Sequence, residues 1–454
     1  MSAIQKTNTA GVARLGWLDK LYVGLLLAVF GGIVLHAPLS VGLSTLWPDY
    51  SLLIKSWKEI LLGAALLLLI VILTMRRQWA LIKTNHVIYL IIGFALLNVL
   101  LIPLSHTGSQ AILAGILINL RYLLFFALVY AAILLYPQYY RPFLYVFIGG
   151  MAVVIVFAIL QLTVLPHDIL KYLGYTKETI APYLTVDQNP NYIRINSTLR
   201  GPNPLGAYAV IVLGTMMALW FRGPKKLSKP ALWTVIVLGL GSVAALWASY
   251  SRSAVLGAVV AVGLVVLAVY GVKIGRKAWI VLGIVALVLC GSLVAFRDTQ
   301  FVSQVILHQD PLEGNHLNSN EGHAQSLAEG LSQMVKQPLG GGIGSTGSAS
   351  LLSNSPLIIE NQYLFVAHET GWLGLILFVW ITILVLVQLW KRRRHWLNLG
   401  VFASGAGLAI VGLVLPVWVD ETVAMVWWGA AALALAIPLA QVTSKSSKRD
   451  KSHG

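Results

Sequence analysis

Twelve long apolar runs restrict this chain to one kind of fold. Each approaches or exceeds the roughly 20 residues that an α-helix needs to cross a bilayer. Of the 454 residues, 58% are apolar and only 11% are charged. We therefore predict one integral-membrane domain over 1–454, an all-α polytopic membrane protein with about 12 transmembrane helices. The runs are 17–36, 57–75, 86–104, 112–135, 143–165, 203–221, 231–249, 253–271, 278–295, 362–390, 398–416 and 423–441.

The net charge of +16 is distributed unevenly between the two sides that these runs define. Of the 32 basic residues, 22 fall on the side that holds both chain ends, together with only Asp19 and Asp450 of the 16 acidic residues. An excess of lysine and arginine marks the cytoplasmic side. Both termini are thus predicted to be cytoplasmic, and the positive charge indicates topology and argues against a nucleic-acid partner.

This topology defines two cytoplasmic tails and two outer loops. The tails are 1–16 and the basic 442–454, which could touch anionic membrane lipids. The outer loops are 166–202 and the large loop 296–361, between the ninth and tenth runs. The first run begins at Trp17 without a small-residue cleavage site after it, so we interpret it as an anchor. The single cysteine, Cys290, lies in the ninth run and cannot form an internal disulfide.

Isolated arginines stand at or near the outer membrane boundary. Arg121 lies inside the fourth run, where a charge is costly and needs a partner. It is either a functional residue or a structural one that pairs with a neighbouring helix or reaches the interface. Arg194, Arg200 and Arg252 lie beside helix-breaking or hydroxyl-rich segments. Arginine grips phosphate with two parallel hydrogen bonds, so these residues suit a lipid-linked diphosphate, although any one of them could simply anchor a helix end.

The large outer loop and the start of the tenth run carry candidates for a general base. His323, Glu360, His368 and Glu369 could accept a proton from an attacking hydroxyl. The spacing supports no metal site, because the outer side has no His-x-x-x-His and no Asp-x-Asp. The glycine run Gly340–Gly344 lacks the Lys-Ser/Thr pair of a Walker loop, and a plain turn is the simpler interpretation. Residues 324–336 show helical spacing of apolar side chains and predict one amphipathic helix in this loop.

The order and spacing of four loose motifs resemble the O-antigen ligase/polymerase superfamily. The resemblance covers about 194–385 in its motifs and the whole chain in its run plan. The motifs are Arg194-x-Asn-Ser-Thr-Leu-Arg200-Gly-Pro-Asn-Pro, Ser249-Tyr-Ser-Arg252-Ser, Gly322-His323 with Gln337-Pro-Leu-Gly-Gly-Gly-Ile-Gly344, and Glu360-Asn-Gln-Tyr-Leu364 with Glu369-Thr-Gly371.

That resemblance implies a metal-independent, inverting glycosyltransferase with a GT-C-like fold and no cofactor. Such enzymes move glycan from undecaprenyl diphosphate to a hydroxyl of a glycan, lipid or protein acceptor, on the extracytoplasmic face of the cytoplasmic membrane. By position, Arg194, Arg200 and Arg252 would hold the diphosphate. The remaining substrate-binding candidates are Arg121, Asn361 and Tyr363, and the catalytic candidates are Arg252, Glu360, His323 and His368.

Ligases of this family usually have a histidine where this chain has Glu360. Either Glu360 or His323 is then the base, or the acceptor differs from a lipid A-core sugar. A transporter or flippase of lipid-linked glycans is the alternative function, and a scaffolding membrane protein is a third. Transporters place polar groups near the membrane midplane, often in two related halves. This sequence shows no such repeat and gathers its polar residues on one side, which favours the transferase.

Overall fold

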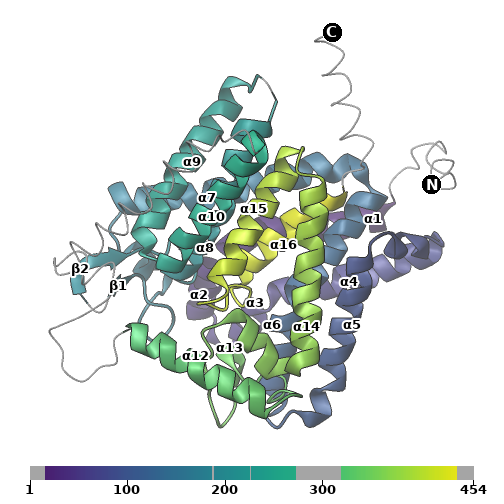
Figure 1. Ribbon diagram of the computed structural model, residues 1–454, viewed down its shortest axis with the longest axis vertical. Coiled ribbons are helices and arrows are strands. Elements are labelled where there is room, and N and C mark those ends of the chain that lie inside the picture. The colour runs from purple at the N-terminus through teal and green to yellow at the C-terminus, as the bar shows by residue number, and fades with distance from the viewer. Residues whose placement is uncertain (1–15, 187–188, 225, 272–318, 437–454) are drawn as a thin grey trace.

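The computed structural model describes residues 16–186, 189–224, 226–271 and 319–436, apart from the side chains of 82–84 and 319–326. In these ranges it is a helical bundle with one small sheet (Figure 1). The helices are α1 (Trp17–Gly32), α2 (His36–Leu46), α3 (Ser51–Lys55), α4 (Trp57–Met75), α5 (His86–Leu100), α6 (Ser109–Leu135), α7 (Tyr140–Thr163), α8 (Pro202–Arg222), α9 (Lys229–Ser249), α10 (Arg252–Tyr270), α12 (Ser319–Lys336), α13 (Gly347–Ser350), α14 (Gln362–Lys391), α15 (Trp396–Val411) and α16 (Glu421–Ala436).

Nine helical segments within the described ranges are long and apolar enough to cross a membrane. They correspond to the first eight predicted runs and the tenth, and the first run continues through a 3₁₀ turn to Leu46. The ninth run, 278–295, lies outside the described residues. The eleventh and twelfth runs correspond to the shorter α15 and α16. The helical, multi-pass character of the prediction is confirmed, while the count of twelve stays a prediction.

The most buried helix is α16, in which every residue from Glu421 to Ala436 is buried. It packs against α6, α8, α14 and α15 at the centre of the bundle (Figure 1). A helix that is apolar all round is the kind that fits such a place, because no face has to meet water. Its one charged side chain, Glu421, is its first residue. The Glu421 carboxylate therefore lies at the first turn of the bundle's central helix.

Polar contacts join several helix ends at one end of the bundle. Asp19 at the start of α1 accepts hydrogen bonds from Arg76 after α4 and from the Tyr136 hydroxyl after α6. Arg222 at the end of α8 donates to the carbonyl of Ala268 in α10 over 2.8 Å. The starts of α4, α6, α8 and α16 accordingly lie at the opposite end. This division of helix ends between two sides agrees with successive runs that cross the membrane in opposite directions. The prediction of which end faces the cytoplasm depends on the charge distribution.

The opposite end carries the small sheet and the outer-loop helices. Strands β1 (Leu184–Val186) and β2 (Asn189–Arg194) form an antiparallel pair in which Leu184 faces Arg194. The all-α prediction missed this hairpin, because three-residue and six-residue strands are too short to give a clear alternating pattern. The predicted amphipathic helix is present as α12, which packs on α14 and crosses the lower end of the bundle in Figure 1.

Helix α14 is interrupted near its outer end. Gly371 has φ 68° and ψ −173°, which divides the helix into a short outer part, Gln362–Thr370, and a long remainder. Only glycine adopts this backbone conformation readily. The short outer part holds His368 and Glu369 and begins two residues after Glu360. The direction of these side chains is thus set separately from the direction of the membrane-spanning part.

Candidate functional site

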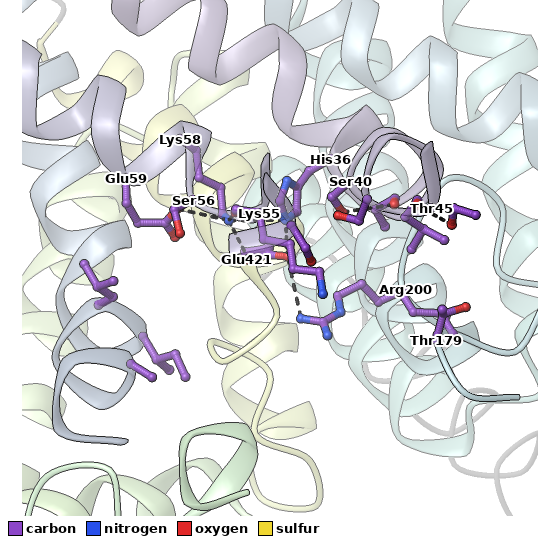
Figure 2. A pocket seen from close by; sticks show the side chains of 18 of the residues that line it. His36, Ser40, Thr45, Lys55, Ser56, Lys58, Glu59, Thr179, Arg200 and Glu421 are labelled. Atoms are coloured by element: carbon purple, nitrogen blue, oxygen red, sulfur yellow. Dashed lines mark hydrogen bonds and ion pairs between the residues drawn. The ribbon is translucent and has the colours of Figure 1, made fainter. Parts of the chain in front are cut away.

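A cavity of about 570 Å³ lies where α2, α4, α6 and the start of α16 meet. Serine and threonine hydroxyls and charged side chains line part of its wall (Figure 2), and apolar side chains such as Val41 and Leu117 line the remainder. The basic residues are Lys55, Lys58, Arg121 and Arg200, and the acidic residues are Glu59, Glu178 and Glu421. With His36 neutral, the lining carries one more positive charge than negative. The cavity therefore favours an anionic ligand.

Glu421 is the residue on which the charged side chains converge. Its Oε2 lies 3.1 Å from the Lys58 ammonium and accepts a hydrogen bond of 3.0 Å from Arg121. Its Oε1 lies 2.8 Å from His36 Nε2 and 3.7 Å from the Arg200 guanidinium. Glu421 is 4% exposed. Three cations and an imidazole around one buried carboxylate form a preorganised group with more positive charge than that carboxylate can balance.

Lys58, in the first turn of α4, is surrounded by polar and charged groups. Its ammonium donates to the carbonyl of Lys55 over 3.0 Å, lies 3.2 Å from His36 Nε2, and forms ion pairs with Glu59 Oε2 at 3.2 Å and Glu421 Oε2 at 3.1 Å. An ammonium is costly to bury unless such partners surround it. Lys58 is 2% exposed, so its charge is held in a fixed place beside the cavity.

The tautomer of a neutral His36 ring follows from its neighbour Trp57. The indole Nε1 of Trp57 donates to His36 Nδ1 over 2.9 Å. Since an indole N–H can only donate, Nδ1 must be the accepting nitrogen. A neutral ring then carries its hydrogen on Nε2, next to Glu421 Oε1. His36 Nε2 thus contacts both Glu421 Oε1 and the Lys58 ammonium, which lies 3.2 Å away.

Arg121 has the partners that its position in an apolar run requires. Besides Glu421, it lies 3.5 Å from Glu59 and donates to the carbonyl of Val419 over 2.6 Å. It is 8% exposed and also lines the cavity. The two interpretations of Arg121 are thus compatible: it pairs with neighbouring helices and belongs to a charged cavity.

Arg200 reaches the same cavity from the segment before α8 (Figure 2). The turn that precedes it is fixed to α7. Ser197, at φ 51°, donates its Oγ to the carbonyl of Val154 over 2.7 Å and its amide to Gln161 Oε1 over 3.0 Å. The side chain of Arg200 is 52% exposed, and its 3.7 Å ion pair with Glu421 is loose. Arg200 is therefore a basic side chain that can turn toward a ligand.

The other two arginines lie elsewhere. Neither Arg194 nor Arg252 is among the described residues that line the cavity. Arg194 donates to the carbonyl of Ser249 over 2.9 Å and to Asn203 Oδ1 over 2.6 Å, which joins β2 to the end of α9 and the start of α8. Arg252 is exposed as the first residue of α10. The four predicted arginines thus form two pairs. Arg121 and Arg200 line the cavity, and Arg194 and Arg252 lie near the α9–α10 turn.

A smaller cavity of about 150 Å³ lies between these two places. Asn203, the partner of Arg194, lines it on one side and Asp420 on the other, and its remaining lining is mainly apolar. Burial raises the pKa of the Asp420 carboxyl, and the amide of Val423, which donates to it, acts in the opposite direction. Asp420 directly precedes Glu421, so consecutive residues line the two cavities.

The residues after Glu360 fasten α14 to its neighbours. Asn361 caps α14 by accepting from two backbone amides, and its Nδ2 donates to the carbonyl of Leu413 over 2.7 Å. The Tyr363 hydroxyl donates to the carbonyl of Ala409 over 2.8 Å. Glu360 is half-buried and is not among the cavity-lining residues that the structure describes. Asn361 and Tyr363 thus use their polar atoms within the protein.

The two histidine candidates differ in what can be said of them. His368 is 6% exposed and lies against the glycine run, where its backbone carbonyl accepts from the amide of Gly341 over 2.6 Å. His323 belongs to α12, but its side chain is outside the described residues. Among the described residues, no group of three His, Cys, Asp or Glu side chains is arranged to hold a metal ion.

Sequence reasoning missed four members of the charged cluster: His36, Lys58, Glu59 and Glu421. A usable signal was present, because Lys58 and Glu59 interrupt the start of an apolar run. Charges at such positions are candidates for function by default. Glu421 lies between the eleventh and twelfth apolar runs, and no local pattern shows that it begins the most buried helix.

The fold and this site define a multi-pass membrane protein with a buried, positively charged cavity at one end of its bundle. The family model described as O-antigen ligase matches residues 238–379. This match confirms the predicted resemblance to the O-antigen ligase/polymerase superfamily. It supports a family that transfers glycan between lipid-linked donors and acceptors in the membrane. No curated protein matches the sequence.

Proposed function

We propose that this chain is a glycosyltransferase of cell-surface polysaccharide assembly. It transfers or polymerises glycan from undecaprenyl diphosphate onto an acceptor hydroxyl on the outer face of the cytoplasmic membrane. The family match supports the transfer of glycan. The observation that carries the choice of donor is the convergence of Arg121, Arg200 and Lys58 on one cavity. A diphosphate is a compact anion, and guanidinium and ammonium groups bind it through charge-assisted hydrogen bonds.

In the proposed reaction, the oxygen of the acceptor hydroxyl attacks the anomeric carbon of the donor glycan. The bond from that carbon to the diphosphate oxygen breaks, and undecaprenyl diphosphate leaves with the electron pair. Attack from the opposite face inverts the anomeric centre. Arg200 and Arg121 stabilise the charge that develops on the leaving group, which is a large contribution in a desolvated site. The displaced hydroxyl proton goes to a base, for which Glu360, His323 and His368 are the candidates.

The existing ion pairs suit this role. Lys58 and Arg121 are held by Glu59 and Glu421 before any ligand arrives, so little reorganisation is needed when the diphosphate binds. Arg200 is the member with the loosest contact and is assigned to close on the diphosphate. Arg194 and Arg252 remain candidates for a second contact with the glycan substrates, and Asn361 and Tyr363 for placing the segment that follows Glu360.

Substitution of Arg200 tests the donor assignment. In vesicles with purified protein and a polyprenyl-diphosphate-linked glycan, Arg200→Ala should reduce transfer about 10²-fold to 10³-fold. Arg200→Lys should retain an intermediate rate, because it keeps the charge and loses the bidentate geometry. The melting temperature should not change, since this side chain is 52% exposed.

Lys171→Ala is the matched control. Lys171 is another exposed cation of the same outer loop, paired with Asp168 at 2.6 Å and away from the cavity lining. It should transfer glycan at the wild-type rate. Wild-type transfer by Arg200→Ala would overturn the donor assignment. Movement of the lipid-linked glycan across the bilayer without a new glycosidic bond, seen as unchanged product mass, would favour a flippase instead.

A further inference from the structure

The glycine run Gly340–Gly344 does more than turn the chain. Gly344, at φ 77°, packs on α6 so closely that a Cβ there would lie 2.2 Å from the carbonyl oxygen of Ala111. A Cβ on Gly115 of α6 would lie 2.5 Å from the Gly344 amide nitrogen. Glycine is therefore needed on both sides of this contact. The run is a backbone-to-backbone docking site on α6.

Hydrogen bonds fix the register of this docking. The amide of Ile343 donates to Ser105 Oγ over 2.8 Å, and the hydroxyl of Thr107 donates to the carbonyl of Ile343 over 2.8 Å. On its other side, the run contacts the break in α14, where a Cβ on Gly340 would lie 2.8 Å from the amide of Gly371. The run is thus held between α6 and the short outer part of α14.

One buried carboxylate connects all three pieces. Glu369, in the short outer part of α14, is completely buried. Its Oε2 accepts from Asn119 Nδ2 of α6 over 2.9 Å. Its Oε1 accepts from the amide of Thr346 over 3.3 Å, and the amide of Gly344 also donates to this carboxyl group. All three partners are N–H donors, so an acceptor-only carboxylate satisfies each of them.

Asn119 extends the network into a further helix. Its Nδ2 also donates over 3.1 Å to Oδ1 of Asn98, whose own Nδ2 donates to the carbonyl of Phe94 within α5. Both asparagines are buried. Asn119 stands two residues before Arg121 on α6, so one helix carries both the contact to Glu369 and a charge of the cavity.

We propose that Glu369 is a positioning residue: it locks the glycine run to α6 and thereby sets the outer part of α14, and with it Glu360, relative to the charged cavity. This inference rests on the proposed transferase function. A second contact points the same way, because Gln362 Oε1 accepts from the amide of Trp418 over 2.8 Å. Trp418 lies three residues before Glu421. The start of α14 is therefore hydrogen-bonded to the segment that leads into the cavity carboxylate.

Thiol labelling tests the lock without any assay of activity. In purified protein with Cys290→Ser, a cysteine at Ala349 reports on α13, which directly follows the run and packs on α6. Ala349 is 1% exposed, so Ala349→Cys should react slowly with a maleimide. Adding Glu369→Ala should raise the labelling rate of this cysteine at least about tenfold. Losing the contacts of Glu369 lowers local stability, so the open state in which the thiol is accessible becomes more populated. The neighbouring Leu351→Cys, at 62% exposure, should label fast in both backgrounds.

Two further variants separate the lock from general destabilisation. Gln388→Leu removes a polar pair with Asn85 from the other end of α14, where the two side chains exchange hydrogen bonds of 2.9 and 3.0 Å. It should leave labelling at Ala349→Cys unchanged. Glu369→Gln keeps one acceptor oxygen but replaces the other with a donor, so its labelling rate should lie between those of wild type and Glu369→Ala.

Kinetics then test the positioning role. Glu369→Ala should lower kcat about tenfold or more and leave the KM for the donor within about twofold, because the cavity cations are intact. Glu369→Gln should recover part of kcat. Unchanged labelling in Glu369→Ala overturns the lock. Raised labelling with unchanged kcat overturns positioning, as does a raised donor KM with unchanged kcat. If wild-type protein transfers no glycan, the proposed function fails while the labelling result still decides the lock.

Discussion

Two buried glutamates at the same end of the bundle do different work. Glu421 is surrounded by an ammonium, two guanidinium groups and an imidazole beside a cavity of about 570 Å³. Glu369 is surrounded by one side-chain amide and two backbone amides. Cations can be shared with an incoming anion, whereas backbone amides cannot leave without moving the loop. The kind of donor around a carboxylate therefore distinguishes a binding site from a positioning contact.

The family match falls unevenly on these two regions. Residues 238–379 include Glu369, the glycine run and Glu360, but neither Arg121, Arg200 nor Glu421. The charged cavity is thus assembled from residues outside the matched segment. The outer part of α14 belongs to the match, and its Gln362 accepts from the amide of Trp418, three residues before Glu421. If the proposed function is correct, the family segment supplies the base, and the remainder of the chain builds the diphosphate site.

The largest effect should come from Glu421→Ala. This change leaves Lys58 and Arg121 buried with Glu59 as their remaining carboxylate. Breaking a buried ion pair on one side typically costs about 3–5 kcal/mol. We expect a large drop in melting temperature in detergent together with loss of transfer. Glu421→Gln keeps the shape of the side chain and should lose less stability. A melting temperature equal to wild type in Glu421→Ala would mean that the cluster does not stabilise the bundle.

A smaller effect, confined to the reaction, should identify the base. Removing a general base typically lowers the rate about 10²-fold to 10⁴-fold. Glu360→Gln, His323→Ala and His368→Ala should be compared by single-turnover transfer at saturating donor. We expect one of these three variants to lose this much of the transfer rate. Glu360→Gln should keep the wild-type melting temperature, because Glu360 is only half-buried. Full turnover in all three variants would exclude Glu360, His323 and His368 as the base.

The smallest effect should come from the docking contact itself. Gly344→Ala places a side chain at φ 77° and against the carbonyl of Ala111, so it should destabilise the protein by about 1–3 kcal/mol. The matched control is Gly93→Ala in α5, where an added Cβ meets no atom within 4 Å. It should be neutral or stabilise by up to about 1 kcal/mol, because alanine is the better helix former. Equal melting temperatures of the two variants would contradict the close approach.

Sequence reasoning located the helices well and the site only in part. Nine predicted runs coincide with long apolar helices because hydrophobic length is a local property of the chain. Arg121 and Arg200 were among the candidates and share the cavity, but Arg194 and Arg252 lie at the α9–α10 turn. Sequence spacing could not separate these pairs, since all four arginines are predicted on the same side of the membrane.

The glycine run shows a second limit. Its composition predicts a turn, and three of its glycines do have positive φ. Its function as a docking surface depends on Gly115 and Ala111 of α6, more than 200 residues earlier in the chain. No local pattern connects them.

The sequence by itself determined the multi-pass helical fold, the positions of most spans and the family resemblance. These follow from apolar length, charge bias and motif order, which are all local or additive along the chain. Only the tertiary structure decided that α16 is the central helix and that Glu421 collects Lys58 and Arg121. The physical reason is that a buried charge is tolerated only with its partners, and Arg121 and Glu421 are 300 residues apart.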